Sequence, residues 1–136
     1  MKKRISTGFL FIILSAILLT LFACGGTSKE PTIVNVTLTE FTITMDTTSI
    51  PAGPVKFIIN NTGGLEHEVV LERAGEVDEP FENGDKASEA EAIASSTSST
   101  LEWTIDEPGQ YQLACHVNKD GIDHYMLGMV QEFTVK

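Results

Sequence analysis

The chain has 136 residues, about one domain's worth, and a formal net charge of −10. This acidic balance disfavours nucleic-acid binding, which depends largely on Lys and Arg side chains at phosphates, so we expect no nucleic-acid partner. The chain has no glycine-rich phosphate-binding motif and no recognisable pair of a catalytic nucleophile and its base. We therefore predict that it is not an enzyme.

Residues 1–23 are predicted to be an export signal rather than part of the domain. Three basic residues at positions 2–4 precede an almost wholly apolar stretch that ends at Ala23 and Cys24, which is the layout of a signal peptide. A retained membrane helix is the alternative, but the stretch only just reaches the roughly 20 residues needed to span a bilayer. Removal of the segment would change the net charge to −13, because it holds three basic residues and no acidic one.

The cleavage site resembles that of bacterial lipoproteins, in which the cysteine after the cut becomes the lipid-bearing first residue. Leu21, Ala23 and Cys24 fit this pattern. The resemblance implies a protein that is exported and anchored through lipid on Cys24 to a bacterial membrane, facing the periplasm or the exterior. Residues 24–31 would then form a tether. An ordinary secretory cut, with Cys24 as a bystander, is the alternative.

Beyond the tether, apolar residues alternate with polar ones in about seven short segments bounded by Gly, Pro and Asn. These segments are Val34–Leu38, Phe41–Met45, Val55–Ile59, His67–Leu71, Leu101–Ile105, Tyr111–Cys115 and Met129–Val135. Period-two alternation is typical of strands with one buried face. In the absence of a long helical pattern, it predicts an all-β domain over residues 32–136, folded as an antiparallel β-sandwich.

One acidic, serine-rich segment, Gly75–Thr100, interrupts this alternation. Within it, the run Ser88-Glu89-Ala90-Glu91 has the pattern of a capping box. We therefore expect a short helix over Ala87–Ala94, with a mobile loop as the alternative.

Four residues offer the donor atoms of a metal site. Cys115 is the only cysteine besides Cys24, and a lone thiol in an oxidising compartment needs burial or a bound metal. His67 and Cys115 share strand parity with apolar residues, so both should point into the sandwich. Two His, one Cys and a weak axial Met form the ligand set of blue copper, whereas structural zinc would add another Cys or His. We therefore predict one copper ion bound by His67, Cys115, His124 and Met129.

Around these ligands the chain resembles the plastocyanin–azurin (cupredoxin) family, and more closely its lipid-anchored bacterial members such as the auracyanins. The matching positions are Asn60–Glu68, which lead to and include the first histidine, and Tyr111, Cys115, His124, Gly128 and Met129. The resemblance implies a Greek-key sandwich with a mononuclear type 1 copper site. It also implies single-electron transfer between redox partners outside the cytoplasm, and we expect a monomer.

Two features depart from the family pattern. Eight residues separate Cys115 from His124, where the family usually has fewer. Glu68 stands where many blue copper proteins have an Asn that braces the cysteine loop, and its strand parity predicts that it faces solvent. The neighbouring His116 is predicted to be a surface residue that points away from the metal.

Two other functions are compatible with the same ligands. One is a copper-delivery module that exchanges the metal rather than electrons, and the other is a structural domain that docks to a larger respiratory complex. The acidic surface is expected to favour a basic redox partner. Tyr125, Met126 and Leu127 follow His124 and would form an apolar docking patch beside it.

Overall fold

A computed structural model describes residues 29–136, so the predicted signal peptide and Cys24 lie outside the described residues. Within this range no helix is long and apolar enough to cross a membrane. The elements are all strands: β1 (Thr32–Thr39), β2 (Thr42–Met45), β3 (Ser49–Ile50), β4 (Gly53–Asn61), β5 (His67–Arg73), β6 (Glu82–Asn83), β7 (Lys86–Ala87), β8 (Glu89–Ile93), β9 (Ser98–Ile105), β10 (Gly109–Ala114), β11 (Asn118–Lys119), β12 (Ile122–Asp123) and β13 (Val130–Val135).

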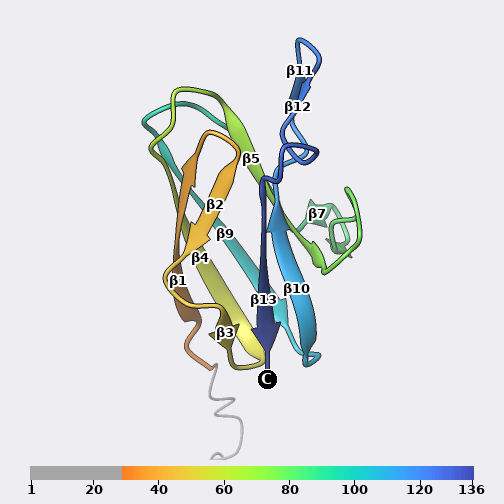
Figure 1. The fold of residues 1–136 in the computed structure, drawn as a ribbon. Helices are drawn as coiled ribbons and strands as arrows, with labels where there is room; N and C mark the ends of the chain where they lie inside the picture. The colour runs from red at the N-terminus through yellow and green to blue at the C-terminus, as the bar shows by residue number, and fades with distance from the viewer. Residues whose placement is uncertain (1–28) are drawn as a thin grey trace, which may run out of the picture.

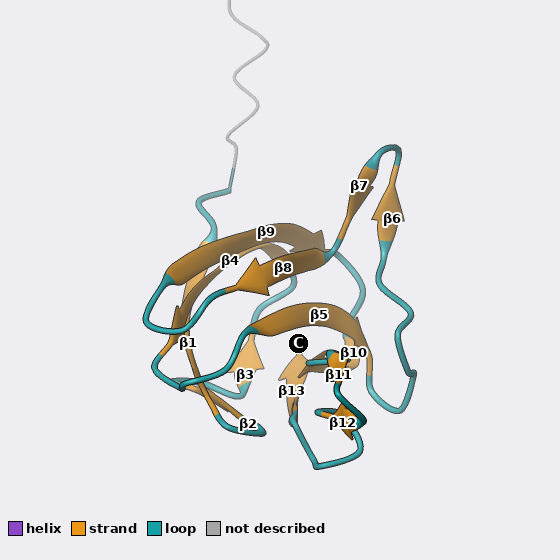
Figure 2. Ribbon diagram, turned by 90° about the horizontal axis from the view of Figure 1, so that it is seen from above, coloured by secondary structure: helices purple, strands orange, loops and turns teal. Residues whose placement is uncertain are grey.

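The strands form two facing sheets, which confirms the predicted β-sandwich (Figures 1 and 2). One sheet has the order β2-β1-β4-β9 and the other the order β3-β13-β10-β5-β8. Most neighbouring strands are antiparallel, but β1 pairs with β4, and β3 with β13, in parallel. In the second sheet β10 lies between β13 and β5, so three segments that are distant in sequence become neighbours.

The two sheets enclose one apolar core, made largely by the residues that the alternation selects. It includes Val34, Val36, Leu38, Val55, Phe57, Ile59, Val69, Leu71, Tyr111, Leu113, Phe133 and Val135. Phe133 packs edge-on against Phe57 and stacks on Tyr111, with ring centroids 5.9 Å apart in both pairs. Full burial of an aliphatic or Phe side chain contributes roughly 1.5–3 kcal/mol, so this core is the main source of stability.

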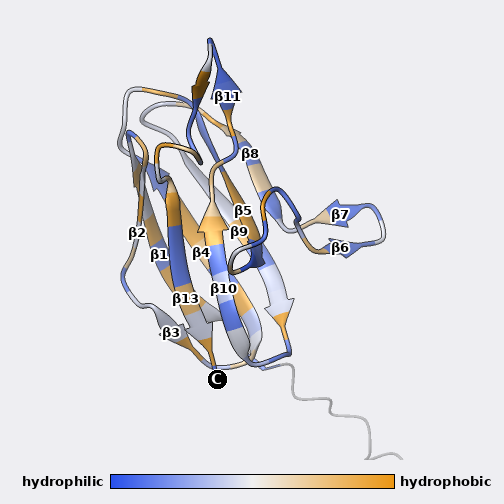
Figure 3. Cartoon of the chain, turned by 45° about the vertical axis from the view of Figure 1, so that its right-hand side comes forward, coloured by the Kyte–Doolittle hydropathy of each residue, from blue (hydrophilic) through white to orange (hydrophobic). Residues whose placement is uncertain are grey.

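The helix expected over Ala87–Ala94 is wrong, because these residues form strands instead. β8 pairs with β5 and forms one edge of that sheet, with Ala90 opposite Val69, and Ala90 and Ile93 are buried in the core. Ser88 does not cap a helix: its hydroxyl donates to the carbonyl of Leu71 at 2.6 Å. Pairing with β5 satisfies the backbone and buries apolar side chains, which outweighs the local helical propensity. The β6–β7 hairpin projects beside the sandwich as a largely hydrophilic arm (Figure 3).

The outer face of β5 and β10 is covered as well, by the chain that follows β5. Glu72 and Gln112 are buried on that face, and the Gln112 amide donates to the Glu72 carboxylate at 2.8 Å. The Gln112 oxygen accepts the N–H of Gly75, and Glu72 accepts the N–H of Glu79. Both central strands are therefore buried on two faces, so their simple alternation of buried and exposed residues is lost.

Candidate metal centre

The sheet order brings His67 and Cys115 together at one end of the sandwich. His67 is the first residue of β5, and Cys115 directly follows β10. These strands are antiparallel neighbours with Val70 opposite Ala114, so the start of β5 lies beside the end of β10. Both side chains are fully buried, as their strand parity predicts.

A β-hairpin returns the chain to this site from the far side of Cys115. β11 and β12 are joined by Asp120 and Gly121, which have φ angles of 54° and 80°. Two positive φ values in a two-residue loop are typical of the mirror-image turn that Asp-Gly favours. Beyond the hairpin, the N–H of His124 donates to the carbonyl of Val117 at 3.0 Å. The long spacing between the ligands is thus taken up by a hairpin that stands clear of the sandwich (Figure 1).

Three donor atoms converge in the space enclosed by these segments. The Nδ1 atoms of His67 and His124 are 3.2 Å apart, and the Sγ of Cys115 lies 4.0 Å from the first and 3.5 Å from the second. The three residues form a fully buried cluster that could hold a metal ion. The structure thus brings together three of the four predicted ligands, His67, Cys115 and His124, and their binding of a metal stays a prediction.

These separations fit a first-row transition metal. A point equidistant from three atoms so placed lies about 2.1 Å from each, which matches metal–nitrogen bonds of ~2.0–2.1 Å and approaches metal–sulfur bonds of ~2.3 Å. Two imidazoles and one thiolate form the trigonal set typical of blue copper. The residues present therefore fit a copper ion.

Met129 is placed next to two of these ligands through its backbone. Its carbonyl accepts the N–H of Cys115 at 3.0 Å, and its own N–H donates to the carbonyl of His124 at 3.1 Å. The side chain is fully buried. Coordination by its thioether stays a prediction.

Burial favours the neutral forms of Cys115 and His67 when no cation is bound. It raises the pKa of the Cys115 thiol, against the opposing effect of hydrogen bonds from the backbone of Glu68 and Val117. Burial also lowers the pKa of His67, and the neighbouring His124 lowers it further. A metal cation would supply the positive charge that a buried thiolate requires, while the neutral imidazole of His67 is already in the ligand form.

Glu68 braces the site, and the expectation that it faces solvent is wrong. Its side chain is half-buried, and its carboxylate accepts the N–H of His116 at 2.8 Å. Its own N–H points at the Sγ of Cys115, at 3.5 Å. The signal in the sequence is its position directly after the predicted ligand His67.

His116 points away from the metal site, as predicted, but it is not a surface residue. Its side chain is only 8% exposed, and its Nε2 lies 3.1 Å from the carboxylate of Glu72. The ring stacks on Tyr125 with centroids 4.7 Å apart. Because His116 follows Cys115 and Tyr125 follows His124, this stack ties together the backbones of two ligands.

Asn61 holds the loop that leads to His67. It is 2% exposed, and its amide donates to the carbonyls of Leu65 and Ile93, at 2.8 and 2.9 Å. Its oxygen accepts the N–H of Gly63 at 3.0 Å. This side chain therefore fixes the approach of the chain to the first histidine.

The surface around His124 is slightly hollow, and both apolar and charged residues line it. His124 is 3% exposed and contributes to a cavity of about 150 Å³, lined also by Leu65, Glu66, Val117, Lys119, Asp120 and Ile122. Leu65, Ile122, Met126 and Leu127 are between 41% and 77% exposed at this end. We call these four residues the apolar end face. Tyr125 is not included in this face, because its ring stacks on His116.

Comparison with solved structures finds the same fold in auracyanins. The reduced auracyanin of Roseiflexus castenholzii is 21% identical, with a TM-score of 0.57 over 79% of this chain and 98% of that one. Auracyanin B is 20% identical, with a TM-score of 0.62 over 79% and 91%. Auracyanin A of Chloroflexus aurantiacus, a blue copper protein, is 18% identical, with a TM-score of 0.57 over 79% and 100%. No curated protein matches the sequence significantly.

The sequence itself carries the family assignment. A family model of the cupredoxin-like domain matches residues 11–124, which is most of the chain. Together with the β-sandwich and the cluster of two His and one Cys at its end, this match shows that the chain belongs to the cupredoxin-like family.

Proposed function

We propose that this protein is an electron carrier with one type 1 copper ion, held by His67, Cys115 and His124 with Met129 as a weak axial ligand. The convergence of two imidazole nitrogens and one thiol sulfur in a fully buried cluster carries this proposal. Membership of the cupredoxin-like family supports it, as does the fold shared with auracyanin A, a blue copper protein.

A bound copper ion would supply a centre that gains and loses a single electron. The protein would contribute ligand atoms that shift little when the charge of the copper ion changes. The Cys115 sulfur is held by the N–H of Glu68, the Cys115 backbone by Met129, and the His124 backbone by Val117. Burial of all three donors excludes water from the site, so neither loss of a ligand nor entry of solvent would accompany the electron.

Electrons would enter and leave through His124, because its ring adjoins the surface cavity at the apolar end face. Neutral side chains there allow a partner to approach closely, and the acidic residues elsewhere on the chain would attract a basic redox protein. We propose that the carrier is exported and held at the membrane by lipid on Cys24, so that it works outside the cytoplasm.

Copper delivery is the second candidate for the same ligands. A delivery protein must release its metal readily, which is easiest when the ligands are accessible. Here the exposed fraction is zero for His67 and Cys115 and 3% for His124. This burial favours retention of the ion and hence electron transfer.

The decisive experiment is visible spectroscopy and voltammetry of the chain from residue 24 onward, loaded with copper. Electron transfer predicts an intense thiolate-to-Cu(II) band, a reversible one-electron potential and slow copper loss to a Cu(I) chelator. Rapid loss to the chelator or to a copper-accepting protein would favour delivery. Copper binding with no thiolate band would overturn the type 1 site.

A further inference from the structure

A second cavity lies at the other end of the strands that carry the copper ligands. It measures about 340 Å³, which falls in the range of small-molecule sites. Its lining comprises Arg73, Phe81, Trp103, Thr104, Ile105, Asp106, Glu107 and Tyr111. Arg73 ends β5 and Tyr111 is near the start of β10, whereas His67 begins β5 and Cys115 follows β10. The cavity is therefore separate from the metal site and has no part in the function proposed above.

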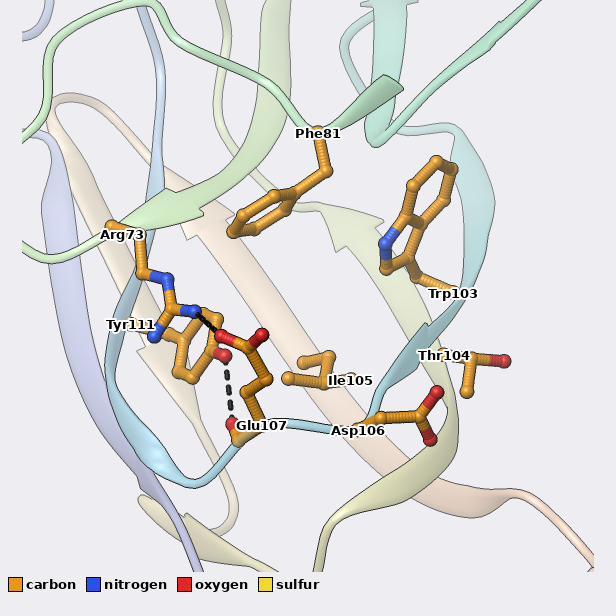
Figure 4. A pocket seen from close by; sticks show the side chains of 8 residues that line it. All are labelled: Arg73, Phe81, Trp103, Thr104, Ile105, Asp106, Glu107 and Tyr111. Atoms are coloured by element: carbon orange, nitrogen blue, oxygen red, sulfur yellow. Dashed lines mark hydrogen bonds and ion pairs between the residues drawn. The ribbon is translucent and has the colours of Figure 1, made fainter. Parts of the chain in front are cut away.

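One half of this cavity already holds a cation against an aromatic ring. The guanidinium carbon of Arg73 lies 4.7 Å from the centroid of the Tyr111 ring, which is within cation–π range. The same guanidinium forms an ion pair with the carboxylate of Glu107, and the Tyr111 hydroxyl donates to the Glu107 carbonyl at 2.7 Å. An aromatic face and a carboxylate here hold one positive group between them (Figure 4).

The other half repeats these elements, and no cation is among its lining residues, although Lys86 lines an adjoining cavity with Phe81, Trp103 and Asp106. Phe81 and Trp103 lie on two sides of the cavity, which Asp106 also lines (Figure 4). Among residues 29–136, Asp106 forms no ion pair. The lining carries one positive and two negative charges, so a single negative charge is left unbalanced. It contains no Asn or Gln, whose amides would be expected in a site for a neutral sugar.

We propose that this cavity binds a monovalent organic cation, an alkylammonium or guanidinium group, between Phe81 and Trp103 with its charge toward Asp106. Aromatic faces attract such cations through their negative quadrupole, and quaternary ammonium groups are recognised in this way. The volume admits the cationic head of a small molecule or one basic side chain of a peptide. The acidic character of the chain adds a favourable long-range field.

The chain has a built-in reporter for this test, because Trp103 is its only tryptophan. Its fluorescence in the copper(I) protein would be followed while choline is added, and separately acetyl-arginine-amide. The matched control ligand is 3,3-dimethylbutanol, which has the shape of choline without its charge. We expect a saturable change with the cations and at least a several-fold weaker response to the alcohol. Tighter binding of choline or of the arginine derivative would identify a free small molecule or a peptide side chain as the source of the cation.

Three variants separate local recognition from general charge attraction. Asp106→Asn should weaken choline binding about two- to five-fold, as for loss of one exposed ion pair, and Phe81→Ala should do so to a similar extent. Glu132→Gln removes the same charge from an exposed position on β13 that does not line the cavity and should leave binding unchanged. The proposal is overturned if Trp103 shows no saturable response, if the alcohol or glucose binds as tightly as choline, or if Glu132→Gln weakens binding as much as Asp106→Asn.

Discussion

The backbone N–H of Glu68 points at the sulfur of Cys115, 3.5 Å away, and the carboxylate of Glu68 accepts the N–H of the residue that follows this cysteine. The backbone and the side chain of Glu68 thus connect the start of β5 to the sulfur of Cys115 and to the backbone of His116. In addition to bracing the loop, the carboxylate places a negative charge close to the metal site.

Replacing this charge should change the reduction potential. Glu68→Gln keeps an oxygen to accept the N–H of His116 but removes the negative charge, which stabilises Cu(II) more than Cu(I). We expect a rise of roughly 40–170 mV, equivalent to about 1–4 kcal/mol for charges a few ångströms apart, from the bulk-water limit to the protein-surface value. Voltammetry would measure it. Glu66→Gln, an exposed position on the other side of His67, is the control, and an equal rise there would refute a specific effect of Glu68.

The thiolate of Cys115 should be the source of colour. Cys115→Ser is expected to abolish the visible charge-transfer band and most of the copper affinity, because a hydroxyl is a much poorer ligand for copper than a thiolate. His116→Gln, at the adjacent position facing Glu72, should retain the band. Titration with copper followed by absorption would check both variants, with circular dichroism to confirm folding. Persistence of the band in Cys115→Ser would exclude this ligand.

The thioether of Met129 should tune the potential as a weak axial ligand. Met129→Gln is expected to retain copper and to lower the potential, since a harder donor favours Cu(II). Met126→Gln, which alters a methionine that is 77% exposed, should leave the potential unchanged. Voltammetry and the absorption spectrum of both variants give the comparison, and an unchanged Met129→Gln protein would show that this sulfur is not bound.

The rate of electron transfer to a redox partner should depend on an apolar and an electrostatic contribution to docking, which different variants can separate. Leu127→Lys, on the apolar end face, should slow electron transfer to a basic partner at every salt concentration. Asp120→Asn with Asp123→Asn should weaken the salt dependence only, because exposed charges are screened beyond about 8 Å at physiological ionic strength. Asparagine suits both positions: it tolerates the positive φ of Asp120 and can still accept the N–H of Met126 that Asp123 accepts.

Stopped-flow kinetics over a range of salt concentrations would measure these rates. If Leu127→Lys leaves them unchanged, the partner docks elsewhere, and the β6–β7 hairpin becomes the next surface to test.

Lipid on Cys24 should decide where the protein resides. We expect the wild-type protein in the membrane fraction of cells and the Cys24→Ala variant without lipid. Fractionation combined with mass spectrometry of the N-terminus would establish both points. Recovery of the entire wild-type population as a lipid-free protein would reject the anchor and leave the ordinary secretory cut.

Sequence alone predicts those parts of the structure in which the burial of a residue follows from the alternation of apolar and polar residues around it. Alternation selects the core residues of β1 and β4 because each of these strands has one face against the facing sheet. The same parity places His67 and Cys115 inside. The cluster is predictable because a combination of soft sulfur and imidazole donors, two of them on apolar strand faces, has few other uses.

What the sequence does not reveal depends on contacts between distant segments. Ala90 becomes a strand residue because β5 offers it an edge, and nothing near Ala90 in sequence indicates this. Glu68 and His116 are braces because strand pairing brings β5 beside β10. Burial of Glu72 likewise depends on the covering chain at Gly75–Glu79, which supplies one of its hydrogen-bond donors.

The hydrogen bond between Val117 and His124 closes the base of the hairpin that follows Cys115, so the hairpin leaves and rejoins the sandwich at one point. Its two ends are held together at the sandwich, so the separation of the ligands along the chain no longer determines their separation in space. Loop length then has little thermodynamic cost, since closure entropy grows only slowly with the number of residues. The tip of this hairpin is therefore a site where the chain can lengthen, shorten or acquire new recognition residues, while the geometry at the metal is inherited unchanged.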